Sequence, residues 1–138
     1  MQNYKELDVW QKAVRLATEL YGLTAHFPDT ERYGLIAQIR RAATSVPANI
    51  AEGRGRGSTG EYVQFLLIAR GSLMELETHL IIAQNLGYLS RALFEPAQRR
   101  IEDIAKMLNR LVGSLRSRRS GSGVANPEPR IPKPEQQG

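Results

Sequence analysis

The chain contains no cysteine, which excludes both a disulfide framework and a metal held by thiolates. Its two histidines, His26 and His79, form neither the His-x-x-x-His nor the Glu-x-x-His spacing that metal sites in helical bundles use. No apolar run approaches the roughly 18–20 residues that a membrane span needs, and the charged N-terminus does not resemble a signal peptide. We therefore expect a cytoplasmic protein with no metal, no other cofactor and no membrane contact.

Motifs that support catalysis are also lacking. The run GRGRG at positions 53–57 has no Lys-Ser/Thr step, which a phosphate-binding loop requires, and no serine stands in a nucleophile elbow. Glu75 and Glu77 are two positions apart and fall on different helix faces, so they cannot act as a carboxylate pair. His79 lies within an apolar pattern and is interpreted as a partly buried, hydrogen-bonded core residue. We expect the protein not to be an enzyme.

The 138 residues carry a formal net charge of +5, which favours polyanionic partners. The last stretch, SGSGVANPEPRIPKPEQQG, is rich in proline and glycine, and its acidic and basic residues cancel. This composition predicts a disordered tail over residues 120–138 and one folded domain over residues 1–119 that holds the whole charge excess.

Apolar residues at steps of three and four predict four helices, over about residues 8–25, 30–51, 58–86 and from about 90 to the arginines near 119. Asp29 or Thr30 is expected to cap the second helix, and Tyr33 is placed on its apolar stripe. Pro47 should kink that helix near residues 44–47, because a mid-helix proline removes a backbone hydrogen bond, and the helix should resume over residues 48–52. The glycines at 53, 55 and 57 should then end it. Pro96 leaves two alternatives: a short turn followed by a helix, or one kinked helix.

The third helix has clear boundaries and an unusually wide apolar arc. Ser58 and Glu61 form a capping box at its start, and Gly87 is expected in the left-handed conformation after its end. The apolar arc is wider than a helix with one neighbour requires. Either this helix is central in its own domain, or its outer edge is buried by another subunit. Gly71 costs about 1 kcal/mol of helix propensity and favours a close helix crossing.

Four long helices with short connections and no strand pattern predict an all-α fold, namely an antiparallel up-and-down four-helix bundle. Within it, the segment QIRRAATSVPANIAEGRGRG at positions 38–57 combines small residues, a proline and four arginines. We identify the candidate nucleic-acid-binding residues as Arg40, Arg41, Arg54, Arg56 and Arg70. Guanidinium groups suit bidentate phosphate contacts, and the glycine-rich loop offers backbone amides. The alternative is structural: Asn49 and Glu52 tie the helix end, while the arginines pair with acids across subunits.

Several stretches carry a resemblance to a known family. They are YKELDVWQKAVRLATELY, FPDTERYGLIAQIRRAATSVPANIAEGRGR, EYVQFLLIARGSLMELETHLIIAQNLGYL and the later MLNRLVGSL, which together span about residues 4–116. With them the chain resembles the four-helix-bundle proteins named after the 23S rRNA intervening sequences that encode some of them. Asn49, Glu52 and Gly53 are part of the family signature.

The resemblance implies a ring-shaped homo-oligomer, a pentamer in related members. It also implies a distant relation to accessory proteins of diversity-generating retroelements, which bind nucleic acid and a reverse transcriptase. RNA or DNA binding is therefore one hypothesis for function. The other is a scaffold or accessory subunit that binds a protein partner and has no nucleic-acid affinity.

Overall fold

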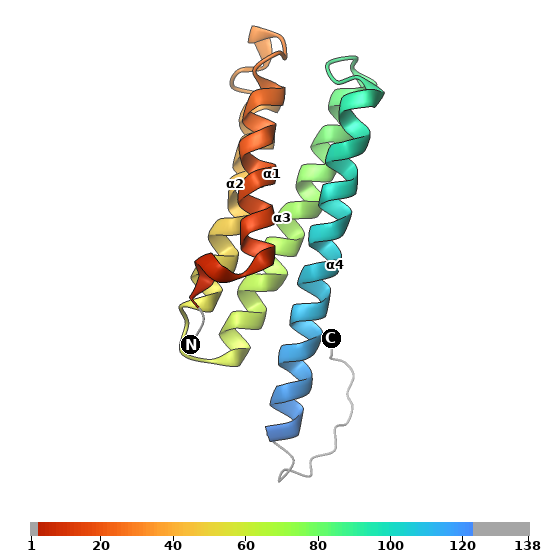
Figure 1. The fold of residues 1–138 in the computed structure, drawn as a ribbon. Helices are drawn as coiled ribbons and strands as arrows, with labels where there is room; N and C mark the ends of the chain where they lie inside the picture. The colour runs from red at the N-terminus through yellow and green to blue at the C-terminus, as the bar shows by residue number, and fades with distance from the viewer. Residues whose placement is uncertain (1–2, 123–138) are drawn as a thin grey trace, which may run out of the picture.

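The computed structural model describes residues 3–122, which contain four α-helices, two short 3-10 helices and no strand. The helices are α1 (Asp8–Thr24), α2 (Leu35–Arg54), α3 (Thr59–Asn85) and α4 (Arg91–Ser122), with η1 (Tyr4–Glu6) before α1 and η2 (Asp29–Glu31) before α2. Figure 1 shows the four long helices side by side with short connections between them. The all-α prediction is confirmed.

The helices pack around one core to which all four contribute. α2 contacts both α1 and α3, α4 contacts both α3 and α1, and α1 and α3 lie diagonally opposite each other. The largest fully buried side chains are Leu20, Ile39, Val46, Ile50, Leu66, Leu73, Leu76, Leu80, Ile104 and Leu108. The heptad-spaced apolar residues of the fourth helix were predicted to form a seam, and four of them are buried while Leu111 is half-buried. The five residues are Ile101, Ile104, Leu108, Leu111 and Leu115.

The predicted boundaries of α3 are confirmed. The hydroxyl of Ser58 accepts a hydrogen bond from the backbone N–H of Glu61 at 3.1 Å, which satisfies one of the unpaired donors of the first turn. At the other end Gly87 has φ +82°, the left-handed conformation that favours glycine. Its N–H and that of Tyr88 donate to carbonyls of the last turn, so α3 ends in a tight turn before α4.

The predicted start of α2 is wrong. Residues 29–31 form η2, and α2 begins only at Leu35, whose N–H donates to the Glu31 carboxylate at 2.9 Å. Glu31 is held there from its other oxygen by the hydroxyl of Tyr88 at 3.0 Å. Tyr33 therefore lies in a turn and is 88% exposed, and it is not part of the apolar stripe.

α2 is continuous from Leu35 to Arg54 with Pro47 buried inside it, so the chain does not leave the helix at the position of the predicted kink. Two side chains close to Pro47 donate hydrogen bonds to backbone carbonyls of the preceding turn of α2. The Thr44 hydroxyl donates to the Arg40 carbonyl at 2.9 Å, and the Asn49 amide donates to the Ser45 carbonyl at 2.8 Å. These bonds, together with burial of the ring, keep the helix in register past the proline.

Gly53 lies within α2 and is buried, so it does not end the helix as predicted. A Cβ atom at this position would lie 2.7 Å from Cβ of Phe65 and 3.2 Å from the carbonyl oxygen of Tyr62. Real Cβ atoms do not approach other atoms that closely. Gly53 is therefore required for the close approach of α2 and α3 near their connection, and the helix ends one residue later.

Of the two alternatives for the last helix, the single helix is correct, since α4 contains Pro96 in its second turn. Ser90 caps it by accepting from the Leu93 N–H at 3.3 Å. The helix continues to Ser122, three residues beyond the predicted domain boundary, and residues 123–138 of the predicted tail lie outside the described residues. No helix within residues 3–122 is long and apolar enough to cross a membrane.

Candidate nucleic-acid interface

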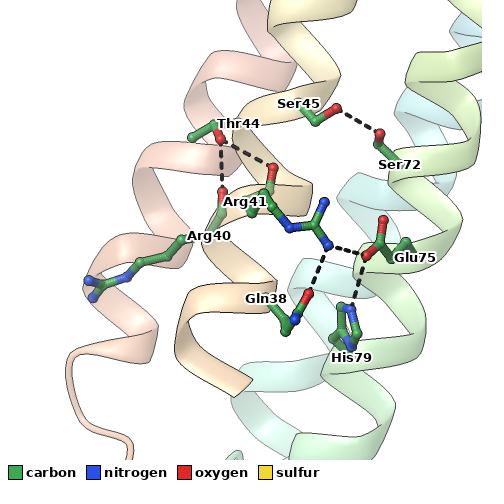
Figure 2. Close-up of polar contacts among 8 residues, drawn as sticks. All are labelled: Gln38, Arg40, Arg41, Thr44, Ser45, Ser72, Glu75 and His79. Atoms are coloured by element: carbon green, nitrogen blue, oxygen red, sulfur yellow. Dashed lines mark hydrogen bonds and ion pairs between the residues drawn. The ribbon is translucent and has the colours of Figure 1, made fainter. Parts of the chain in front are cut away.

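The twin arginines of α2 lie on opposite flanks of the helix. The Arg40 guanidinium donates to the Tyr21 carbonyl at 3.1 Å and to the Thr24 hydroxyl at 2.9 Å, with its carbon 4.5 Å from the centre of the Tyr21 ring. Figure 2 shows Arg40 directed to α1, and Arg41 directed the other way, to α3. Arg40 thus satisfies a carbonyl in the last turn of α1, where a positive charge also favours the helix dipole.

Arg41 is the centre of a polar group between α2 and α3. Its Nη2 donates to the Glu75 carboxylate at 2.6 Å and to the Gln38 amide oxygen at 2.7 Å, and His79 Nε2 lies 3.4 Å from the same Glu75 oxygen (Figure 2). The hydrogen bond from Arg41 holds the pKa of the Glu75 carboxyl below its ordinary value, and His79 adds a smaller lowering. This arginine meets a carboxylate of its own chain.

The Glu75 contact predicts a pH-dependent contribution to stability. A carboxyl whose pKa is lowered by folding stabilises the folded state above its ordinary pKa, and this stabilisation is lost as the pH falls through the folded pKa. We expect Glu75→Gln to lower the free energy of unfolding by less than about 1 kcal/mol at neutral pH, because the pair is exposed. In denaturant melts the difference from wild type should shrink progressively as the pH falls below the ordinary carboxyl pKa of about 4.3; a difference that stays constant down to about pH 2 would contradict the assignment.

Asn49 and Glu52, the polar members of the family signature, have local partners. The Asn49 amide also donates to the Ser45 hydroxyl at 3.0 Å, and Ser45 and Ser72 share a hydrogen bond of 2.8 Å across the α2–α3 contact (Figure 2). The Glu52 carboxylate lies 3.5 Å from Nη1 of Arg56, one turn later. Asn49 thus belongs to a group that links the middle of α2 to α3, and Glu52 contacts the stretch just after α2, all within one chain.

The other arginines of the segment surround a groove at the end of the bundle, where α2 connects to α3. We call it the end groove. It has a volume of about 390 Å³ and is lined by Leu7, Arg54, Arg56, Gly57, Ser58, Thr59, Tyr62, Leu111, Leu115 and Arg118. These residues come from the start of α1, the α2–α3 connection and the last turns of α4, which lie together at the lower end of the bundle in Figure 1.

The charged residues that the structure describes in the lining of the end groove are all positive. Among the described residues that line it, three are arginines and none is acidic. A second groove, between α1 and α4, is mixed: its lining contains Lys12, Arg15 and Arg100 together with Glu19 and Asp103. Glu52 contacts Arg56 without being among the described lining residues of the end groove, and the excess of cations there favours polyanions, whereas the second groove neutralises itself.

Arg54 and Arg56, two arginines of the end groove, lie near aromatic rings. The guanidinium carbon of Arg54 lies 6.0 Å from the centre of the Tyr62 ring, and that of Arg56 lies 5.0 Å from the centre of the Phe65 ring. Burial raises the pKa of the Tyr62 hydroxyl, and the nearby charges of Arg54 and Arg118 act against this rise. The guanidiniums of Arg54 and Arg118 are thus close enough to the Tyr62 hydroxyl to affect its ionisation.

The structure brings Arg54 and Arg56 together but places the other predicted residues elsewhere. Arg40 and Arg41 contact α1 and α3 away from the groove, and Arg70 donates to the Asn109 side chain on α4 at 2.8 Å. Arg118 was considered in the sequence only as a charge at a helix C-terminus. The sequence did contain a signal that could have identified Arg118 as a groove residue. If successive helices alternate in direction, the end of α4 lies beside the α2–α3 connection.

Among residues 3–122 no group of three or more His, Asp or Glu residues could hold a metal ion. Residues 5–110 match the 23S rRNA-intervening sequence protein family.

The chain belongs to this family.

A solved structure from Bacteroides thetaiotaomicron, a protein of unknown function from the S23 ribosomal protein family, has the same fold. Its TM-score is 0.71 and its sequence identity is 24%, over 76% of this chain and 95% of that one. No curated protein matches the chain. At this identity the likeness supports the fold alone.

Proposed function

We propose that this 23S rRNA-intervening sequence family protein is a non-enzymatic nucleic-acid-binding protein, with RNA as its main ligand, and that the end groove is the contact surface. The observation that carries the proposal is the convergence of Arg54, Arg56 and Arg118 on one groove, in whose lining the described residues include no acidic one. Guanidinium groups bind phosphate oxygens in bidentate fashion, so three of them on one concave surface suit a phosphate backbone.

The proposal predicts binding that depends steeply on salt and little on sequence. Each phosphate neutralised releases counterions, so the logarithm of affinity falls linearly with the logarithm of salt concentration, with a slope of about −0.7 per contact for a single strand. Titration of a labelled RNA at about 50 and 200 mM salt tests this, since three contacts should lower the affinity at least roughly tenfold between the two. Binding that salt does not weaken would oppose phosphate recognition.

The proposal includes assembly of antiparallel, up-and-down bundles into a ring-shaped homo-oligomer. Early residues of α2 contact late residues of α3, as with Arg41 and Glu75, while Gly53 near the end of α2 lies against Phe65 near the start of α3. This order of contacts supports the antiparallel direction. In a ring the end groove repeats with each subunit, which would multiply weak phosphate contacts through avidity.

The outer face of α3 is the surface that supports assembly. Its most exposed residues between positions 64 and 85 are uncharged, whereas the charged Arg70, Glu75 and Glu77 are half-buried. The exposed ones are Gln64, Ile68, Gly71, Met74, Thr78, Ile81, Ile82 and Asn85. Met74 is 58% exposed and Ile68 is 49% exposed, and a Cβ atom at Gly71 would meet no other atom within 4 Å. No packing within the described chain uses Gly71, so its cost in helix propensity is explained by a helix of another subunit crossing there.

Charges on this face should therefore dissociate the assembly. We expect Ile68→Glu combined with Ile82→Glu to reduce the solution mass to the 15.4 kDa of one chain, because assembly would bury two unpaired carboxylates. Light scattering gives the mass, and Thr18→Glu combined with Ala92→Glu adds the same charge at exposed positions on α1 and α4. A wild-type mass of 15.4 kDa would refute the oligomer, and an unchanged mass in the double variant would refute this interface.

A protein-interaction scaffold is the second candidate function, and the same uncharged face of α3 favours it. Exposed apolar surface of this kind marks protein contacts in general, including contacts with a different protein. This alternative predicts no RNA affinity at about 150 mM salt, together with a discrete partner whose binding the two glutamate substitutions abolish.

A further inference from the structure

The floor of the end groove is apolar, which phosphate binding alone does not require. Leu7 and Leu111 are half-buried there, and Leu115 and Tyr62 are buried beneath the opening. The hydroxyls of Ser58 and Thr59 line the rim together with Arg56. The groove therefore presents cations at its edge and hydrocarbon at its base.

This combination of surfaces matches the parts of a nucleotide. The phosphate is an anion, the ribose is polar, and the base has flat apolar faces that stack on aromatic side chains or on the plane of an arginine guanidinium. Arg54 at the end of α2 and Arg118 on α4 both line the groove, and the charges of both oppose the rise that burial causes in the pKa of the Tyr62 hydroxyl. A base held on the leucine floor would thus have a guanidinium within reach from more than one direction.

We propose that the end groove binds an unpaired nucleotide of single-stranded RNA, with the base on the floor formed by Leu7, Leu111 and Leu115 and the adjoining phosphates on Arg54 and Arg56. The inference rests on the proposed function and narrows it to a ligand class. A duplex cannot use the floor, because its bases are stacked in the interior and it presents phosphates and sugars outward. A volume of about 390 Å³ is small for any larger folded ligand.

Three probes of the same length test the proposal by fluorescence anisotropy on the full chain: a single-stranded RNA of about 12 nucleotides, the same sequence as a duplex, and an abasic ribose-phosphate strand. The single strand is expected to bind at least about fivefold more tightly than the abasic strand, since removal of a stacked base commonly costs that much or more. The single strand should also bind more tightly than the duplex, although the duplex carries more phosphate groups.

Leu111→Ser provides the matched change in the protein. It should reduce affinity for the single strand while leaving affinity for the abasic strand unchanged, because the arginines remain. The comparison of probes on wild-type protein does not depend on how well this variant folds. Equal affinity for all three probes would overturn the single-strand inference and leave phosphate binding in place, whereas no affinity for any probe would overturn the proposed function itself.

Discussion

Replacement of Arg54, Arg56 and Arg118 by alanine together is expected to weaken RNA binding roughly 10- to 100-fold at physiological salt. The three guanidiniums are the only cations among the described residues that line the end groove. The slope of log affinity against log salt should also fall by about 2 in magnitude, which reports the loss of phosphate contacts directly. Titration of labelled RNA at several salt concentrations measures both quantities.

A control with the same loss of charge separates the groove from the general basicity of the chain. Arg32, Arg99 and Lys106 are exposed, and none of them lines the end groove. Their triple alanine variant should bind RNA nearly as well as wild type. If both triple variants lose affinity equally, the binding surface is diffuse and the end groove is not the site.

The remaining predicted arginines should behave differently from those of the groove. Arg40→Ala removes bonds to Tyr21 and Thr24, so its main expected effect is a lower melting temperature rather than weaker RNA binding. The fold should tolerate the groove substitutions better, because an exposed ion pair such as Arg56–Glu52 contributes only about 0–1 kcal/mol.

Gly53→Ala is expected to destabilise the bundle by about 1–3 kcal/mol, although alanine is the better helix former. The added methyl would lie 2.7 Å from Cβ of Phe65, an atom next to the backbone that cannot move without α3. The helices must therefore separate near their connection, and this cost exceeds the gain of about 1 kcal/mol in propensity. Denaturant unfolding at a fixed protein concentration measures the change.

Gly113→Ala is the matched control for Gly53→Ala. Gly113 is an exposed helical glycine of α4, and a Cβ atom there would meet no other atom within 4 Å. Only the propensity change should remain, so this variant is expected to gain up to about 1 kcal/mol. A Gly53→Ala variant as stable as Gly113→Ala would show that the α2–α3 contact is looser than described.

Much of the fold could be predicted from the sequence because it depends on local patterns. The four helices follow from apolar spacing, the start of α3 from Ser58 and Glu61, and the turn after it from Gly87. Hydrophobic periodicity and capping act over a few residues, so a single sequence displays them. The lack of cysteine and of suitably spaced histidines, also visible in a single sequence, excluded disulfides and the usual metal sites of helical bundles.

At several positions, tertiary contacts override local preference. Pro47 has a strong local tendency to break a helix, but burial between neighbouring helices keeps α2 continuous. Gly53 resembled a helix stop, whereas its role depends on Phe65, a residue twelve positions away on another helix. Tyr33 fitted the apolar period but precedes the true start of α2, which the Glu31 carboxylate determines.

The sequence by itself determined that this chain forms a basic, all-α protein with an arginine-rich segment, because composition and periodicity need no knowledge of neighbours. Only the tertiary structure decided which arginines act together. Adjacent positions on α2 point about 100° apart, so Arg40 and Arg41 reach different helices, while Arg118, distant in sequence, joins Arg54 and Arg56 at one end. Convergence in space depends on helix packing, which brings side chains together irrespective of their order along the chain.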